Sequence, residues 1–172
     1  LALIAYVAPA KAVNPASLDI TVQISATKSL AVNTTFYNYG ALAVNTSSVS
    51  GHIMVTNDSG ALIETYTLQG ANAISSGGQN WTLAASPGTD IYALAAQFSA
   101  AAPTNLDGSW TSDDLTTSAI VATASVLGNT TAGESGAAVV PSAVRNLWFR
   151  LKTPTVVSDV SQRKATLTLA VQ

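Results

Sequence analysis

Apolar and polar residues alternate along much of this 172-residue chain. Residues two positions apart share a face of an extended strand, so alternation is typical of a strand that is buried on one side only. In LDITVQIS, for example, Leu18, Ile20 and Val22 lie on one face, and Asp19 and Thr21 lie on the other. The pattern predicts strands over residues 18–25, 29–33, 50–57, 62–69, 81–84, 91–98, 119–127, 146–152 and 163–172.

Turn residues separate these segments, as in the Gly-, Asn- and Pro-containing stretches 57–60, 75–78 and 86–88. About nine or ten short strands with frequent turns predict an all-β fold, an Ig-like or jelly-roll β-sandwich with an extended N-terminal arm. We expect residues 104–117 to form a polar loop at one end of the sandwich. Within it, Ser112 is placed to cap a short helix over the acidic pair that follows.

Two stretches of the chain resemble Ig-like modules of secreted and cell-surface proteins. Residues 35–68 contain an aromatic residue before a glycine (Tyr39-Gly40), a short strand at Ala43-Val44, and an alternating strand that ends in V-T-N. The close, LWFRLKTPTVVSDVSQRKATLTLAVQ, is similar to the final hairpin of such modules. The resemblance implies an Ig-like fold in an extracellular protein, usually adhesive or structural, and it carries no catalytic residues.

Composition bears on how such a domain is used. Charged residues make up 9% of the chain and apolar residues 48%, with a net charge of -2, whereas ordinary soluble domains have about a quarter of their residues charged. A free monomer usually keeps a charged surface to remain in solution. The composition therefore favours a subunit that is covered by copies of itself, and the alternative is a neutral secreted monomer.

Several classes of protein are not expected. The seven Lys and Arg residues are scattered, whereas a nucleic-acid surface needs clustered cations. No stretch after the N-terminal run approaches the 18 to 20 or so apolar residues of a membrane span. The chain has no Cys and therefore no disulfide framework. It also shows no acid–base pair or G-x-S-x-G signature, and its one histidine, His52, has no partner, so we do not expect an enzyme.

The first eight residues, LALIAYVA, are apolar throughout. They could be the end of a signal peptide, with an A-x-A cleavage site at Ala10-Lys11-Ala12. They could also be a retained strand of about 26 Å that completes the sheet of a neighbouring subunit. On the second interpretation, residues 1–15 form an arm, residues 16–172 form a single β-sandwich domain, and Pro15 marks the boundary. The side chains of the inter-subunit donor strand would be Leu1, Leu3, Ile4, Tyr6 and Val7.

Polar and aromatic residues supply a few further candidate sites. Asp107, Asp113 and Asp114 could offer oxygen ligands to Ca²⁺, although their spacing is not that of an EF-hand and a solvated turn with an N-cap explains them better. No other cofactor is expected. Trp148 lies opposite Leu147 and Phe149 in the alternation, which marks it as an interface aromatic or as a half-buried edge residue.

Asn-x-Ser/Thr sequons are candidate glycosylation sites. Two of the five fall in predicted turns, where a glycan would be most accessible. The sequons are at Asn33, Asn45, Asn57, Asn80 and Asn129, and the two in turns are Asn57 and Asn129.

Two functional hypotheses follow from the sequence. The first is a secreted, cell-surface structural subunit that polymerises with copies of itself by strand exchange into a filament, tube or sheath. The second is a monomeric secreted adhesion or carbohydrate-binding module that uses exposed aromatic residues or a Ca²⁺ loop.

Overall fold

The structure is a computed structural model that describes residues 21–23, 25–131 and 133–172. It is essentially all-β, as the alternation predicts, with a single short 3-10 turn, η1 (Asp107–Ser109), in the part described. The strands are β1 (Leu30–Val32), β2 (Ser47–Val49), β3 (Ile53–Asn57), β4 (Tyr66–Gln69), β5 (Ile74–Ser75), β6 (Thr82–Leu83), β7 (Ile91–Phe98), β8 (Ile120–Val121), β9 (Val144–Lys152), β10 (Arg163–Lys164) and β11 (Thr168–Val171).

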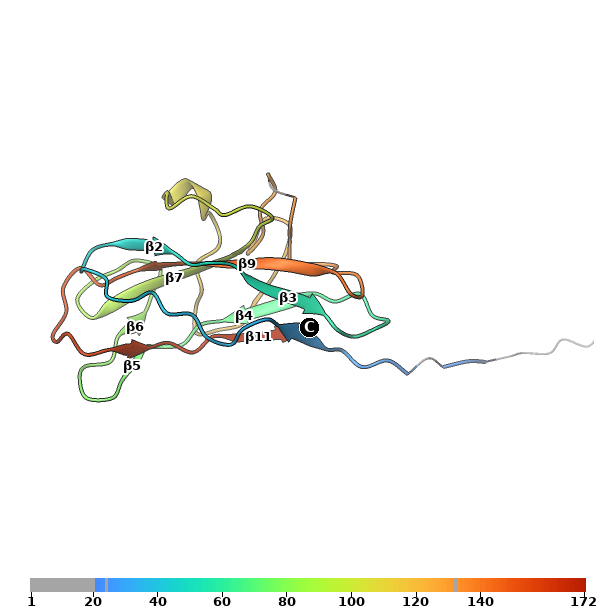
Figure 1. Ribbon diagram of the computed structural model, residues 1–172, viewed down its shortest axis with the longest axis horizontal. Helices are drawn as coiled ribbons and strands as arrows, with labels where there is room; N and C mark the ends of the chain where they lie inside the picture. Colours follow the sequence, from blue (N-terminus) through green and yellow to red (C-terminus); the bar gives the residue numbers. More distant parts are fainter. Residues whose placement is uncertain (1–20, 24, 132) are drawn as a thin grey trace, which may run out of the picture.

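The largest sheet is built around the two long strands, β7 and β9. Its order is β1-β3-β9-β7-β6, and β2 continues the line of β3 along the same edge of β9. β7 and β9 are antiparallel over six residue pairs, from Ala93↔Lys152 to Phe98↔Leu147, whereas β6 pairs with β7 in parallel. Its strands β2, β7 and β9 form the upper layer in Figure 1, and the sheet curls so that β6 and β1 lie lower, beside β5 and β11.

A second layer lies below it (Figure 1). It consists of the three-stranded sheet β11-β4-β8 and the two-stranded sheet β10-β5. In β11 and the residues before it, Leu167, Leu169 and Val171 are half-buried while Thr166 and Thr168 are exposed. The alternation predicted for this segment is therefore confirmed.

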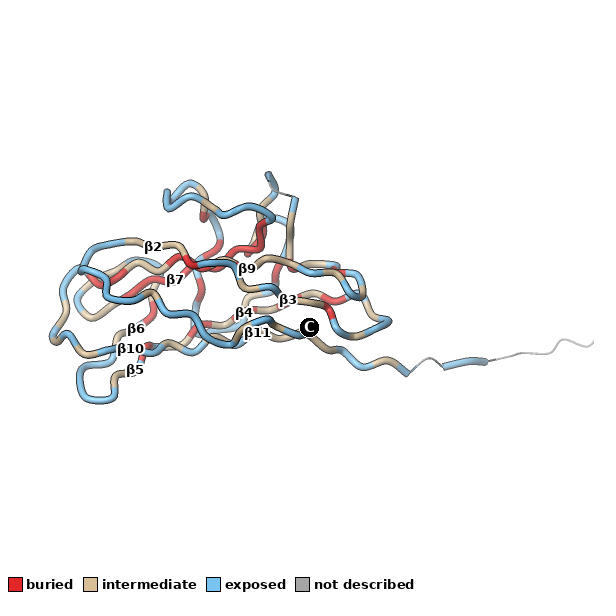
Figure 2. The backbone as a smooth tube through the Cα atoms, in the orientation of Figure 1, coloured by how far each residue is buried: buried red, intermediate tan, exposed pale blue. Residues whose placement is uncertain are grey.

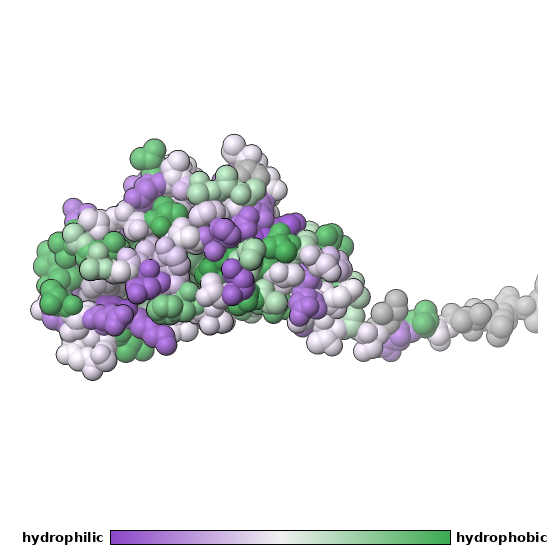
Figure 3. Space-filling view, in the orientation of Figure 1, coloured by the Kyte–Doolittle hydropathy of each residue, from purple (hydrophilic) through white to green (hydrophobic). Residues whose placement is uncertain are grey.

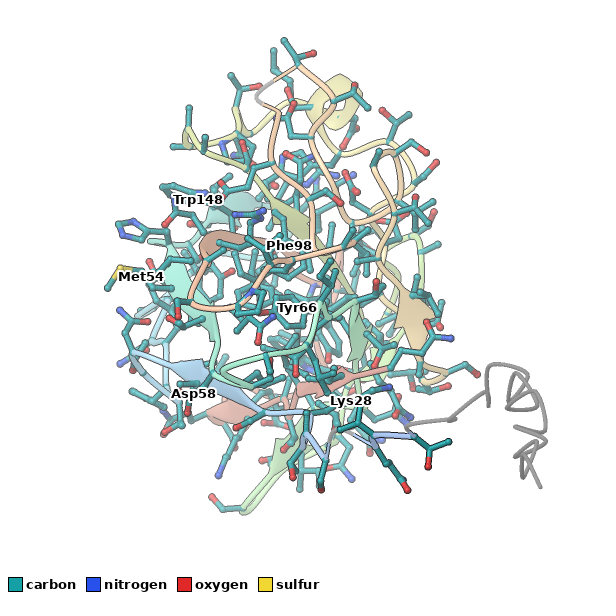
Figure 4. The ribbon with its side chains drawn as sticks, turned by 90° about the vertical axis from the view of Figure 1, so that its right-hand side faces the viewer. Lys28, Met54, Asp58, Tyr66, Phe98 and Trp148 are labelled. Atoms are coloured by element: carbon teal, nitrogen blue, oxygen red, sulfur yellow. The ribbon has the colours of Figure 1, made fainter. Side chains whose placement is uncertain are left out.

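The hydrophobic core fills the space between the two layers. Tyr66 and Leu68 of β4 face Phe98 of β7 and Leu147 of β9, and all four side chains are buried. The rings of Tyr66 and Phe98 lie 5.7 Å apart between centroids, and both point into the middle of the molecule (Figure 4). The core thus joins residues that are more than 80 positions apart in the chain.

β7 differs from the other strands because both of its faces are buried over residues 92–98 (Figure 2). Its inner face contributes Tyr92, Leu94, Ala96 and Phe98 to the core. Its outer face is covered by the loop that follows it, which carries η1 and the buried Trp110. Backbone hydrogen bonds from the Ala96 amide to the Asp113 carbonyl and from the Leu115 amide to the Leu94 carbonyl, both under 3 Å, fix this loop along the strand.

Most of the predicted strands are confirmed, and β7 has the predicted bounds. Of residues 119–127, only Ile120 and Val121 form a strand, the two-residue β8. The chain after β8 leaves that sheet, and Gly128 then lies beside Phe98 of β7. The helix predicted after Ser112 is wrong: Ser112 has a φ of +64°, and Asp113 and Leu115 run beside β7 as an extended segment. Whether the sandwich is of the Ig-like or the jelly-roll type stays a prediction.

The strand predicted over residues 18–25 is not formed by those of its residues that the structure describes. Residues 21–23 and 25–29 have no strand assignment, and Val22 is 86% exposed. They extend beyond the end of β1, away from the sheets (Figure 1). An alternating sequence without a partner strand has nowhere to bury its apolar face, so these residues find no sheet within the described part of their own chain.

Gly136 provides a test of how tightly the core is packed. A Cβ atom at this position would lie 2.4 Å from Cε2 of Phe98 and 2.9 Å from Cβ of Ala122. We expect Gly136→Ala to lower the free energy of unfolding by about 1 to 3 kcal/mol, because Phe98 must leave its position in the core. Gly77→Ala, where the added atom meets nothing within 4 Å, is the matched control in urea denaturation. Equal stability of the two variants would contradict the packing described here.

Candidate functional site

A buried polar network joins β7 to the loop that covers it. Gln97 is a polar residue on the outer face of β7, where its neighbours are Ala93 and Ala95, and it is 4% exposed. Its amide nitrogen donates to the Asp113 carboxylate over 2.8 Å and to the Ser109 carbonyl over 2.9 Å. Its amide oxygen accepts from the Asn129 side chain over 3.3 Å. One glutamine therefore holds two points of the loop and one point of the turn after β8.

Asp113 is fully buried in this network. Burial raises the pKa of its carboxyl to about 6, and the hydrogen bond from Gln97 offsets only part of the effect. A carboxyl in this position is protonated in mildly acidic solution and ionised above it. The loop over β7 thus contains a group whose charge changes near neutral pH.

A second polar cluster ties η1 to β9. The guanidinium of Arg150 and the ammonium of Lys152 both contact Oδ1 of Asp107, at 2.9 and 2.5 Å. The hydrogen bond and charge of Lys152 and the charge of Arg150 hold the pKa of Asp107 below its usual value. Arg150 is buried under Trp110, with its guanidinium carbon 5.3 Å from the ring centroid. The cluster fastens η1 to β9, with one carboxylate shared between two cations.

The three carboxylates predicted as Ca²⁺ ligands do not converge on one site. Asp107 bonds to the two cations on β9, Asp113 is buried against Gln97, and Asp114 is exposed. Among the residues that the structure describes, no group of three or more His, Cys, Asp or Glu side chains could hold a metal ion. Asp107 and Asp113 therefore make structural contacts, and Asp114 is a surface carboxylate.

A polar pocket of about 570 Å³ lies over the network, between the loop and the turn after β8. Hydroxyl and amide groups dominate its wall, and none of the lining side chains is charged. It is lined by Gln97, Ala102, Pro103, Thr104, Gly108, Ser109, Thr111, Ser112, Ser125, Gly128, Asn129, Thr130 and Thr131. Such a wall offers donors and acceptors to a neutral ligand that carries hydroxyl groups.

Each tryptophan is engaged within the chain. Trp148 is half-buried: its indole nitrogen donates to the Ser99 carbonyl over 2.9 Å, and its ring lies 5.3 Å from that of His52. Trp110 is buried, and Trp81 lies under the guanidinium of Arg163. The structure thus places Trp148 at the surface only in part, and its role as an interface aromatic stays a prediction.

The glycosylation sequons differ widely in accessibility. Asn57 is fully buried, and its side chain donates to the Leu62 and Val139 carbonyls and accepts from Ser59. The expectation that a turn would expose Asn57 is therefore wrong, because its amide closes that turn. Asn129 is half-buried and bonds to Gln97 and Ser99. Asn33, Asn45 and Asn80 are exposed, although Asn33 and Asn80 accept backbone hydrogen bonds.

An exposed apolar surface runs along the segment that connects β1 to β2. Four of its side chains are exposed: Phe36 (68%), Tyr37 (41%), Leu42 (37%) and Val44 (47%). We call residues 36–44 the connecting segment. Figure 3 shows apolar side chains gathered at the left-hand end of the view, where this segment turns into β2 and the chain leaves β9. Contiguous exposed apolar surface of this kind marks interaction sites.

The proposed donor strand, with Leu1, Leu3, Ile4, Tyr6 and Val7, lies outside the described residues. The structure does describe where the chain that carries it joins the sandwich. The Ser29 amide donates to Oε1 of the buried Glu64 over 2.8 Å, and the Lys28 ammonium donates to the Gln172 carbonyl. Lys28 lies at the edge of the molecule, where the chain before β1 leaves the sheets (Figure 4).

Two features could not be predicted from the sequence. The first is the polar network at Gln97: a single Gln within the apolar run IYALAAQF indicates a polar contact on a buried strand, but the sequence does not identify the loop that Gln97 contacts. The second is the connecting segment: the Ig-like resemblance implied a short strand at Ala43-Val44, and the structure has no strand there, because the next strand, β2, begins at Ser47. No helix in the described part of the chain is both long and apolar enough to cross a membrane.

Asp113 gives a pH-dependent prediction. Its pKa is raised on folding, so between about pH 4 and pH 6 the folded protein retains a proton that the unfolded chain has lost. The free energy of unfolding therefore falls as the pH rises through this window.

We expect Asp113→Asn to be more stable than the parent at pH 7, by about 1 to 3 kcal/mol, and the two stabilities to converge near pH 4. Thermal unfolding at several pH values measures this, with Asp58→Asn, at an exposed residue away from the network, as control. A parent-like pH profile in Asp113→Asn would contradict the prediction.

Comparison of the chain with protein-family models, with curated protein sequences and with solved structures found no match.

Proposed function

We propose that this protein is a structural subunit of an extracellular filament, tube or sheath, assembled from copies of the same chain by strand exchange. The observation that carries the proposal is the segment before β1. Its sequence alternates as a half-buried strand does, yet its described residues lie beyond the sheets with Val22 86% exposed. A strand sequence without a partner in its own chain is suited to a partner in another.

The balance of charge and apolar surface supports self-association. The chain has 16 charged residues, and 14 large apolar side chains are exposed among the described residues. Some of the exposed side chains cluster near opposite ends of the sandwich. The connection between β3 and β4 and the chain at the start of β9 lie toward the right in Figure 1 and carry the exposed Ile63, Val140 and Val144. The chain before β2 and the chain after β9 lie toward the left and carry the exposed Leu42, Val44 and Val156. Different surfaces at two ends favour head-to-tail contacts, which do not close on themselves and generate filaments.

The attachment of the arm also suits this function. Glu64 and Gln172 bind the chain at Ser29 and Lys28, so the direction in which it leaves is fixed by contacts to two other segments. Residues 21–28 then project along the long axis of the molecule (Figure 1). This geometry presents the preceding residues to a neighbour instead of folding them back.

Removal of the arm tests the proposal. We expect the full chain to sediment as polymers and to form filaments in negative-stain electron microscopy. A chain without residues 1–11 should sediment as a monomer with an unchanged circular dichroism spectrum, because the described sheets do not include these residues. Polymers that persist after the deletion, or a full chain that stays monomeric at high concentration, would rule out assembly by strand exchange.

A second candidate function is that of a secreted adhesion or carbohydrate-binding module, and the polar pocket favours it. Its uncharged, hydroxyl-rich wall suits a neutral oligosaccharide. This site differs from the exposed aromatic residues expected from the sequence, because those are engaged in internal contacts.

The pocket can be tested without disturbing the fold. Ser125 is exposed on its wall, and no hydrogen bond of its hydroxyl is present in the part of the chain described. If maltotriose or chitotriose binds there, amide NMR shifts should change around Gln97, Ser109 and Asn129, and Ser125→Trp should abolish the changes. Ser76→Trp, exposed and outside the pocket, should leave them intact. The absence of shift changes with both sugars at millimolar concentration would count against this function.

A further inference from the structure

The connecting segment, residues 36–44, has the properties of an acceptor for an added strand. It crosses the front of the sandwich in Figure 1, from β1 to β2 and between the two layers, yet it belongs to no sheet. Backbone hydrogen bonds fix the chain just outside it, from the Asn33 amide to the Met54 carbonyl and from the Asn45 amide to the Pro154 carbonyl. Between these points, no backbone-to-backbone hydrogen bond joins residues 34–44 to the rest of the described chain.

The connecting segment is nevertheless held in place. Tyr39 is half-buried and its hydroxyl donates to the Phe149 carbonyl of β9 over 3.2 Å. Burial raises its pKa far above the usual value, so the hydroxyl stays protonated and remains a donor. The ring of Tyr37 meets that of Tyr39 edge to face, with 4.8 Å between centroids. The segment is therefore anchored from within while its outer surface stays exposed (Figure 2).

Two properties of this surface favour an added strand. The first is that the peptide groups of the segment belong to no ladder, although side chains bind the Phe36 amide and carbonyl, the Gly40 amide and the Ala43 carbonyl. The second is that four side chains expose apolar surface to water: Phe36, Tyr37, Leu42 and Val44. An added strand would use both properties, since its backbone would pair with the segment and its side chains would cover the apolar surface. Residues 33–46 contain no charged side chain, so covering them would require no charge to be desolvated.

We propose that the occupant of this surface is the apolar run Leu1–Val7 of a second copy of the chain. The inference rests on the proposed function, and it adds the place where the donor strand binds. The run Leu1–Val7 is apolar and uncharged, like the surface that would receive it. The residues from Ala8 to Ile20 can span at most about 45 Å when extended, which is enough to reach a neighbouring subunit.

The direction of the arm favours a second copy over the same chain. Residues 21–28 leave the sandwich toward the right in Figure 1, whereas the connecting segment runs from β1 toward the left. An arm that bound its own connecting segment would have to reverse its course, past the contacts that fix Lys28 and Ser29. A donor strand that continues in the direction of residues 21–28 leads away from the connecting segment of the same chain, so its acceptor would lie on another molecule.

Disulfide cross-linking tests the proposal directly, because the chain has no native Cys. Chains carrying Ile4→Cys are mixed, under assembly conditions and mild oxidation, with differently tagged chains carrying Tyr37→Cys. We expect cross-links between the two chains at least tenfold more abundant than with Ile74→Cys, an exposed apolar position in β5 (63% exposed). A chain carrying both Ile4→Cys and Tyr37→Cys should cross-link between molecules instead of within one.

Charged substitutions provide a second measurement. Phe36→Asp should raise the concentration needed for polymerisation at least tenfold, and Ile74→Asp, at a residue of similar exposure, should change it much less. Polymers that require the arm but cross-link equally to both positions, or resist Phe36→Asp, would overturn the acceptor assignment and leave the proposed function standing. Cross-links confined to single molecules, or a full chain that forms neither polymers nor cross-links, would overturn both.

Discussion

The burial of both faces of β7 is the constraint on which the rest of the structure depends. A sandwich strand usually leaves its outer face to water, but the outer face of β7 is apolar at Ala93 and Ala95, and here the loop after Phe98 covers it. Small residues, Ala93 and Ala95, let that loop approach closely. Gln97 then provides the polar contacts that an extended segment lying on a sheet requires, because buried peptide and carboxyl groups need partners.

The few charges of the chain serve the same purpose of fastening loops to strands. Arg150 and Lys152 hold η1 through Asp107, and Asp159 accepts hydrogen bonds from the backbone amides of Gln79 and Ser161 and from Arg163. The pKa of Asp159 is held well below its usual range, chiefly by those backbone hydrogen bonds. Few charged side chains hydrate the surface: among the described residues the exposed ones are Lys28, Asp58, Asp107, Asp114 and Lys164. Polar uncharged and apolar side chains supply most of the remaining surface, which favours contact with other copies.

The sequence predicted local features of the fold better than it predicted contacts. Alternation located β3, β7, β9 and β11 because a half-buried strand has a period of two, whatever it pairs with. It could not distinguish a strand with a partner from one without, and so it placed a strand at residues 18–25. The turn at Asn57 was predicted, but its buried amide was not, because the carbonyl of Val139 that it binds is 82 residues away. The pocket and the raised pKa of Asp113 also depend on such distant contacts.

The β1–β3 ladder has a consequence for how the molecule bears load. β1 pairs with β3 over Leu30↔Asn57 to Val32↔Val55, and the chain before it continues outward along the long axis (Figure 1). A pull on that chain would act nearly parallel to the strands. The hydrogen bonds of the ladder would then be loaded together, in shear, instead of opening one after another as in an unzipping hairpin. The Glu64 carboxylate, bound to the Ser29 amide at the start of this ladder, would be among the first contacts to feel the tension.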